Sequence, residues 1–260
     1  MVNPYRFVLV AALVWCPLAV AATQPTTSPV STVIVVDTDQ APEMKDFGER
    51  VRVVAQRWYP IIAADLPGDG FRPPARVTIV FKHMDGIAYT TGPTITCAAK
   101  WFTDHPDDVG AVVHELVHVV QGYTIGHRPG WLVEGIADYI RWFKYEPASA
   151  RPHPNPAHAK YSDSYRTTAA FLDWAVPKYD ADLVRKLNDA CRGGHYRDEL
   201  WKQYTGKTAD ELGQEWIESL RAAQRKPSSN PHPLSYSGSH SASRSSTSAV
   251  AIASHVSAAP

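Results

Sequence analysis

The chain has 260 residues, 44% of them hydrophobic, and its 26 Lys and Arg residues balance its 26 Asp and Glu residues. Since a domain commonly spans ~100–200 residues, this length fits one main domain with a core of its own. The even charge balance provides no overall positive field for nucleic acid or an anionic membrane, so we expect no nucleic-acid partner.

The first segment, residues 1–22, has the pattern of a secretory signal peptide. Arg6 precedes an apolar run at residues 7–20, and the small residues Ala21 and Ala22 follow. The run is shorter than the ~20 residues that a membrane-spanning helix needs. Its order of basic, apolar and small residues is typical of a cleaved leader. We therefore expect a secreted protein, extracellular or periplasmic, with no stable membrane insertion after cleavage.

Composition also separates the two ends of the mature chain from its domain. Residues 23–30 are rich in Thr, Pro and Ser, which predicts a linker. Residues 226–260 consist largely of Ser, Ala, His and Pro, without periodic apolar positions. Such a segment cannot bury enough apolar surface to offset the entropy of ordering, so we expect a disordered tail. The predicted folded domain is residues 31–225.

The first part of this domain predicts strands around one helix. Residues 32–36 and 76–81 are β-branched runs bounded by turn residues, as in buried strands. Residues 43–63 place apolar side chains at three-to-four spacing, which predicts a helix. Residues 94–101 are predicted to be a third strand. From residue 107 onward the pattern is helical apart from a Pro-rich loop, and strands followed by helices predict an α+β fold with a small mixed sheet and a mainly helical C-terminal half.

Two cysteines remain once the leader is removed. They are Cys97 and Cys191. An oxidising compartment allows two cysteines to pair, provided that their Cα atoms lie ~4.4–6.8 Å apart. The sequence leaves a disulfide and two free thiols as open alternatives.

The main chemical motif is HELVH at residues 114–118, within a helix predicted to end at Gly122. His114 and His118 are four residues apart, so both imidazoles project from one helix face and can hold one Zn²⁺ at ~2.0–2.1 Å. Glu115 can serve as general base toward a water whose pKa the metal lowers. The flanking residues are nearly all apolar, which predicts a buried helix. Because burying these side chains without partners is costly, a bound metal explains the motif better than two surface histidines.

A catalytic zinc site needs a third protein ligand and an open position. The apolar run at residues 130–139 contains two acids, Glu134 and Asp138, which lie four apart and share a helix face. We predict that Glu134 is the third ligand. Asp138 is predicted to accept a hydrogen bond from the outer nitrogen of a ligand histidine and so to fix its tautomer.

Two alternatives to this ligand set remain open. Both acids can instead pair with Arg141 or Lys144 at the surface. His127 is the rival third ligand, although an extended zinc motif would place its third histidine at Thr124 and a glycine where this chain has Gln121.

The two segments also carry a family resemblance. HELVHVVQ at residues 114–121, followed by GWLVEGIADYIR at residues 130–141, resembles the plant basic secretory protein family, also called the peptidase family of plants and bacteria. That family resembles the glutamate-zincins. The similarity extends from about residue 33 to residue 220, although this chain is not basic and adds a Ser-rich tail.

The resemblance implies a zincin-like metallopeptidase domain in which the three ligands and Glu115 carry over. It also implies that an edge strand directly before the zinc helix, here residues 94–101, pairs with an extended peptide substrate. The alternative is an ordinary interior strand.

A peptidase also gains from a donor aimed at the oxyanion of the tetrahedral intermediate. Tyr161, Tyr165, His153 and His158 are the candidates. We predict Tyr165, because the resemblance includes this tyrosine and a neutral phenol can donate. The alternative is a tyrosine that packs its ring in the core.

The predicted function is a secreted zinc-dependent peptidase, acting as a monomer on peptide or protein substrates. One alternative is a secreted zinc-binding defence or binding protein with little catalytic turnover. Another is a carbohydrate-active or cell-wall protein, for which the sequence offers only scattered aromatic residues. The presence of Glu115 favours the peptidase, because a structural zinc site needs no general base.

Overall fold

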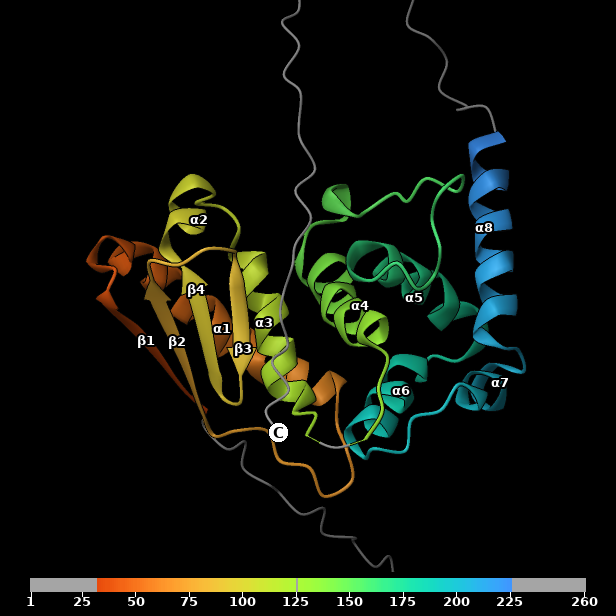
Figure 1. Cartoon of the computed structure of the whole chain (residues 1–260), viewed down its shortest axis with the longest axis horizontal. Helices are drawn as coiled ribbons and strands as arrows, with labels where there is room; N and C mark the ends of the chain where they lie inside the picture. Colours follow the sequence, from red (N-terminus) through yellow and green to blue (C-terminus); the bar gives the residue numbers. More distant parts are fainter. Residues whose placement is uncertain (1–31, 125, 226–260) are drawn as a thin grey trace, which may run out of the picture. The chain divides into compact units, whose positions relative to one another are not determined.

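The computed structural model describes residues 32–124 and 126–225, and all structural statements concern these residues. The predicted signal peptide (1–22), linker (23–30) and tail (226–260) lie outside the described residues. A small mixed sheet comes first in the chain and mostly helices follow (Figure 1), which confirms the predicted α+β class.

The sheet has the strand order β1-β2-β4-β3. Neighbouring strands are parallel except that β3 runs antiparallel to β4. The strands are β1 (Val33–Gln40), β2 (Arg76–Lys82), β3 (Ala88–Thr91) and β4 (Thr94–Ala98). The predicted strands at 32–36 and 76–81 are therefore confirmed, and β1 continues four residues further.

The prediction of an edge strand at residues 94–101 is wrong. β4 lies between β2 and β3, and all its side chains except that of Thr94 are buried. From Ala99 the chain is already helical, in α2 (Ala99–Asp104). The edge strand is β3, which joins β4 through a tight turn where Gly92 has φ 56°, a conformation that glycine adopts at little cost.

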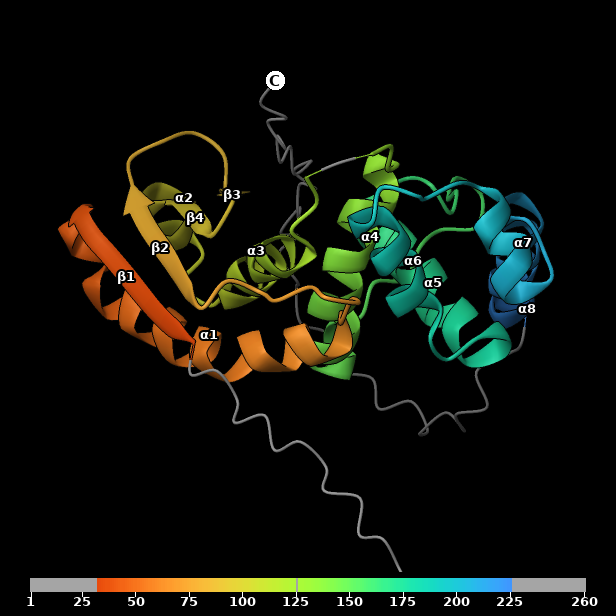
Figure 2. The ribbon, with the colours of Figure 1, turned by 90° about the horizontal axis from the view of Figure 1, so that it is seen from below.

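Helix α1 (Lys45–Asp65) packs along the sheet (Figure 2). It confirms the helix predicted at residues 43–63, shifted by two residues. Phe47 contacts Phe81 of β2 edge to face, with ring centroids 5.7 Å apart. The side chains of α1 that are buried recur at three-to-four spacing: Phe47, Val51, Ala55, Tyr59 and Ile62.

Helix α3 (Val109–Gln121) lies between the sheet and the remaining helices. It contacts α1, β3 and β4 on one side and α4 (Gly130–Ile140) on the other, and α4 packs against α5 (Tyr165–Tyr179). The other helices are α6 (Leu183–Arg192), α7 (Glu199–Thr205) and α8 (Ala209–Arg225). Short turns complete the described chain: 3-10 helices η1 (Pro42–Met44) and η3 (Ala148–Ala150), and a π-helical turn η2 (Arg141–Tyr145).

Cys97 in β4 and Cys191 in α6 are both buried free thiols, so the structure shows the unpaired alternative. Burial raises the pKa of both thiols, that of Cys191 to about 12. Among the described helices, none combines the length and apolarity that crossing a bilayer requires.

Candidate metal centre

Helix α3 carries the HELVH motif into the centre of the domain. The helix begins after Asp108 and ends before Gly122, which has φ 54° and closes the helix in the left-handed conformation. Almost all of its residues are buried, which confirms the expectation of a buried helix. The polar side chains of His114 and Glu115 are therefore held in an apolar environment, at 4% and 3% exposure.

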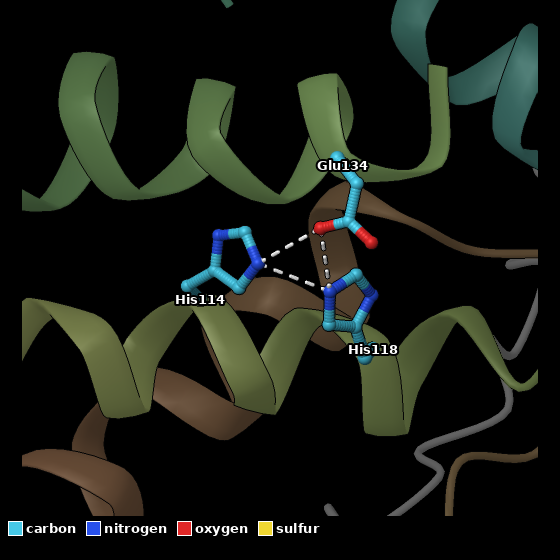
Figure 3. Close-up of side chains that lie close together, drawn as sticks. All are labelled: His114, His118 and Glu134. Carbon is cyan, nitrogen blue, oxygen red and sulfur yellow. Dashed lines mark hydrogen bonds and ion pairs between the residues drawn. The ribbon is translucent and has the colours of Figure 1, made fainter. Parts of the chain in front are cut away.

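Three side chains from two helices converge (Figure 3). His114 and His118 project from α3 toward Glu134 of α4. The two Nε2 atoms lie 3.1 Å apart, and Glu134 Oε2 lies 3.2 Å from His114 Nε2 and 3.3 Å from His118 Nε2. His127 is exposed and does not belong to this group. Among the described residues, His114, His118 and Glu134 form the one group that could hold a metal ion.

The arrangement fits a metal ion. His114 Nδ1 lies 2.7 Å from Asp138 Oδ1 and donates to this carboxylate, so a neutral His114 keeps its lone pair on Nε2. Ligand atoms placed tetrahedrally around Zn²⁺ at ~2.0–2.1 Å are about 3.3–3.4 Å from one another. The measured separations of 3.1 to 3.3 Å are close to this value. With both imidazoles neutral, the cluster presents acceptors that repel one another unless a cation or protons lie between them.

The electrostatics agree. Burial lowers the pKa of His114, but hydrogen bonds to Asp138 and Glu134 outweigh burial and raise this pKa to about 10. At His118, burial lowers the pKa, but the contact with Glu134 outweighs burial and raises it. Burial raises the pKa of Glu134, yet the two histidines outweigh it and lower this pKa. These shifts favour protons on the histidines when no metal is bound, and a metal would have to displace them, so metal affinity would depend on pH.

Asp138 lies where the sequence pattern predicted, behind His114, and is 1% exposed. The alternative of surface pairing between the acids and nearby basic residues is contradicted. Arg141 contacts Asp108 at 2.5 Å, and Lys144 contacts Asp65 at 2.8 Å.

Two further contacts involve residues to which the sequence analysis gave no role. Thr90 of the edge strand β3 lies with its Oγ1 2.7 Å from Oε2 of Glu115 and 3.1 Å from the Glu115 main-chain oxygen. Gln121, the last residue of α3, contacts His118 Nδ1 through Oε1 at 2.7 Å and donates from Nε2 to Val133 O at 3.0 Å. The candidate base and the second histidine thus each have a fixed partner.

Tyr165 opens α5 beside the cluster. Its ring stacks on that of His114, with centroids 6.2 Å apart and an interplanar angle of 23°. Ser164 and Tyr165 have φ values of 64° and 46°, in the left-handed region. For residues other than glycine this conformation costs ~1–3 kcal/mol each, and such strain is concentrated at functional sites.

The three other candidate donors point elsewhere. The Tyr161 hydroxyl donates to Asp210 Oδ1 at 2.8 Å. His153 and His158 line two cavities that contain no residue of the metal cluster. Among the four candidates, Tyr165 is the one that contacts a residue of the cluster.

Comparison with known proteins gives one finding. The family described as peptidase of plants and bacteria has a model that matches residues 38–216. No curated protein and no solved structure matches the chain. The matched region begins in β1 and ends in α8, so it contains the whole cluster and its partners.

Proposed function

Since the chain belongs to the peptidase family of plants and bacteria, we propose that it is a secreted zinc metallopeptidase. His114, His118 and Glu134 hold the ion in this proposal, and Glu115 is the general base. The observation that carries it is the buried convergence of two imidazole nitrogens and a carboxylate oxygen beside a further buried carboxylate. Three protein ligands with a fourth position for water are typical of catalytic zinc. The predicted leader at residues 1–22 supports secretion.

The chemistry divides between the ion and the side chains. A Zn²⁺ ion held by this cluster would lower the pKa of a water molecule toward ~7 and polarise the substrate carbonyl. Glu115 takes a proton from the attacking water and passes it to the leaving amine nitrogen as the C–N bond breaks. Because Thr90 engages Oε2 of Glu115, we assign the proton transfer to Oε1.

Two more residues have roles in this proposal. Asp138 fixes the tautomer of His114 from behind, as carboxylate partners of metal-bound histidines do. Tyr165 donates its phenolic proton to the oxyanion of the tetrahedral intermediate. The stacked position on His114 and the strained backbone support this assignment.

The free edge of β3 is the proposed docking site for an extended peptide. Ala98 N–H donates to Ile87 O at 2.8 Å, so residues 87, 89 and 91 direct their main-chain groups toward β4. By the same alternation, Ala88 and Thr90 direct their main-chain N–H and C=O groups to the free edge of β3. Main-chain pairing there would hold many peptides while reading few of their side chains, which suits a peptidase of broad specificity.

The test combines metal analysis with peptide-library digestion. We expect the purified protein to bind one zinc ion and to cleave peptides in a chelator-sensitive manner. Glu115→Gln should keep zinc and lose hydrolysis, whereas His118→Ala should lose both. Full activity in Glu115→Gln would refute the mechanism. Stoichiometric zinc without cleavage of any peptide would favour the zinc-binding protein with little turnover.

A further inference from the structure

The amide of Gln121 is one of the few buried polar side chains outside the catalytic set. Gln121 is 1% exposed and ends α3, one helical turn after His118. Its side chain connects Nδ1 of His118 to the main chain of α4 at Val133, the residue before Glu134. One side chain therefore joins a ligand of α3 to the segment that carries the ligand of α4.

The orientation of this amide follows from its partners. A main-chain carbonyl only accepts hydrogen bonds, so the NH₂ group of Gln121 must face Val133 O, at 3.0 Å. This direction leaves Oε1 to face His118. Oε1 accepts, so His118 Nδ1 must carry the proton at their 2.7 Å contact.

The consequence reaches the metal cluster. A neutral imidazole with its proton on Nδ1 has its lone pair on Nε2, and Nε2 is the atom of His118 that faces His114 and Glu134. Resting on the function proposed above, we infer that Gln121 is a positioning residue that selects the metal-binding tautomer of His118 and holds α3 in register with α4.

The residue type is specific to this task. Glutamate at position 121 would accept from His118 but would place a second acceptor against Val133 O. Methionine would keep similar bulk and lose both hydrogen bonds. The two histidines therefore differ in their support: His114 has the carboxylate of Asp138, whereas His118 has a neutral amide that orients the ring without adding charge.

Zinc affinity tests the inference without using turnover. We would measure it by competition with a chelator for the parent, Gln121→Met and Gln121→Glu. Gln121→Met should bind zinc about 10–100-fold more weakly, as loss of such outer partners commonly does, whereas Gln121→Glu keeps the acceptor for His118 Nδ1 and should lose less. The matched control is Tyr196→Phe, which deletes a buried hydroxyl that contacts Trp201 Nε1 and Asp198 Oδ1 away from the cluster. It should bind zinc like the parent.

A second readout reports the tautomer itself. In the zinc-loaded parent, the Nδ1 proton of His118 should be visible by NMR and protected from exchange, and Gln121→Met should lose that protection. Parental zinc affinity in Gln121→Met would overturn the inference and leave the peptidase proposal intact. A parent that binds no zinc would instead overturn the peptidase proposal. If Gln121→Met does not fold, the zinc-loaded parent decides, because absence of the protected Nδ1 proton of His118 would overturn the inference.

Discussion

Arg192 of α6 offers a stability prediction that tests how α3 is held in place. Its guanidinium donates to Gln121 O and Val120 O at the end of α3, at 3.1 and 3.0 Å, and to two carbonyls after α1. It also stacks on Phe71, 3.8 Å from the ring centroid. The last carbonyls of a helix lack partners within the helix and carry its negative dipole end, so a buried cation there stabilises both helices.

The perturbation is Arg192→Lys, which keeps the positive charge but removes the planar guanidinium group with its several N–H donors. An ammonium group cannot span carbonyls of two helices, so we expect at least two of the four bonds to be lost. A hydrogen bond to a charged group contributes ~1.5–3 kcal/mol, so the loss of two amounts to about 3–6 kcal/mol of unfolding free energy. The control is Arg185→Lys on the same helix, where the exposed pair with Asp182 at 2.7 Å should contribute ~0–1 kcal/mol.

Urea denaturation of the metal-free proteins measures the effect. The midpoint of Arg192→Lys should fall while the denaturant slope stays constant, because the variant changes stability and not the surface exposed on unfolding. A loss below ~0.5 kcal/mol, within the range of ordinary surface substitutions, would refute this account of Arg192.

Three further predictions concern turnover. Thr90→Val should lower kcat by about 10-fold, because Glu115 loses a hydrogen bond of ~1–2 kcal/mol, while Thr90→Ser should stay near the parent; equal rates in both variants would exclude the contact from catalysis. Tyr165→Phe should keep zinc and lose ~10²-fold in turnover, as removal of an oxyanion donor does; parental activity would return Tyr165 to a packing role against His114. Ala88→Pro should raise KM by removing a main-chain donor at the free edge, with kcat little changed; unchanged peptide kinetics in a folded variant would place substrate elsewhere.

The metal cluster could be predicted because helix geometry is local. Four-residue spacing brings His114 and His118 together on one face, and the same spacing places Glu134 and Asp138 on one face of the next helix. Only the packing of α3 on α4 had to be assumed, and two consecutive apolar helices favour this packing because each buries its apolar face against the other. The edge strand β3 was harder to predict from the sequence, because its four residues are too few to show an alternating pattern.

The roles of Thr90 and Arg192 could not be predicted because their contacts are long-range. Thr90 reaches Glu115 across 25 residues of sequence, and Arg192 reaches Leu66 across 126. Neither residue belongs to a motif, and a threonine in a hairpin or an arginine at a helix end has many ordinary uses. Such roles follow from the tertiary structure alone.

These contacts explain how a buried polar cluster is tolerated inside an apolar helix pair. A buried polar group is costly unless it is hydrogen-bonded, and a partly satisfied network is worse than an apolar core. β3 satisfies Glu115, while Asp138 and Gln121 satisfy the outer nitrogens of His114 and His118. The atoms that these partners leave facing one another are the two Nε2 atoms and Glu134 Oε2. Because Asp138 and Gln121 leave the lone pairs of both Nε2 atoms facing Glu134 Oε2, the surrounding structure presents a set of acceptors that could hold a cation at that point.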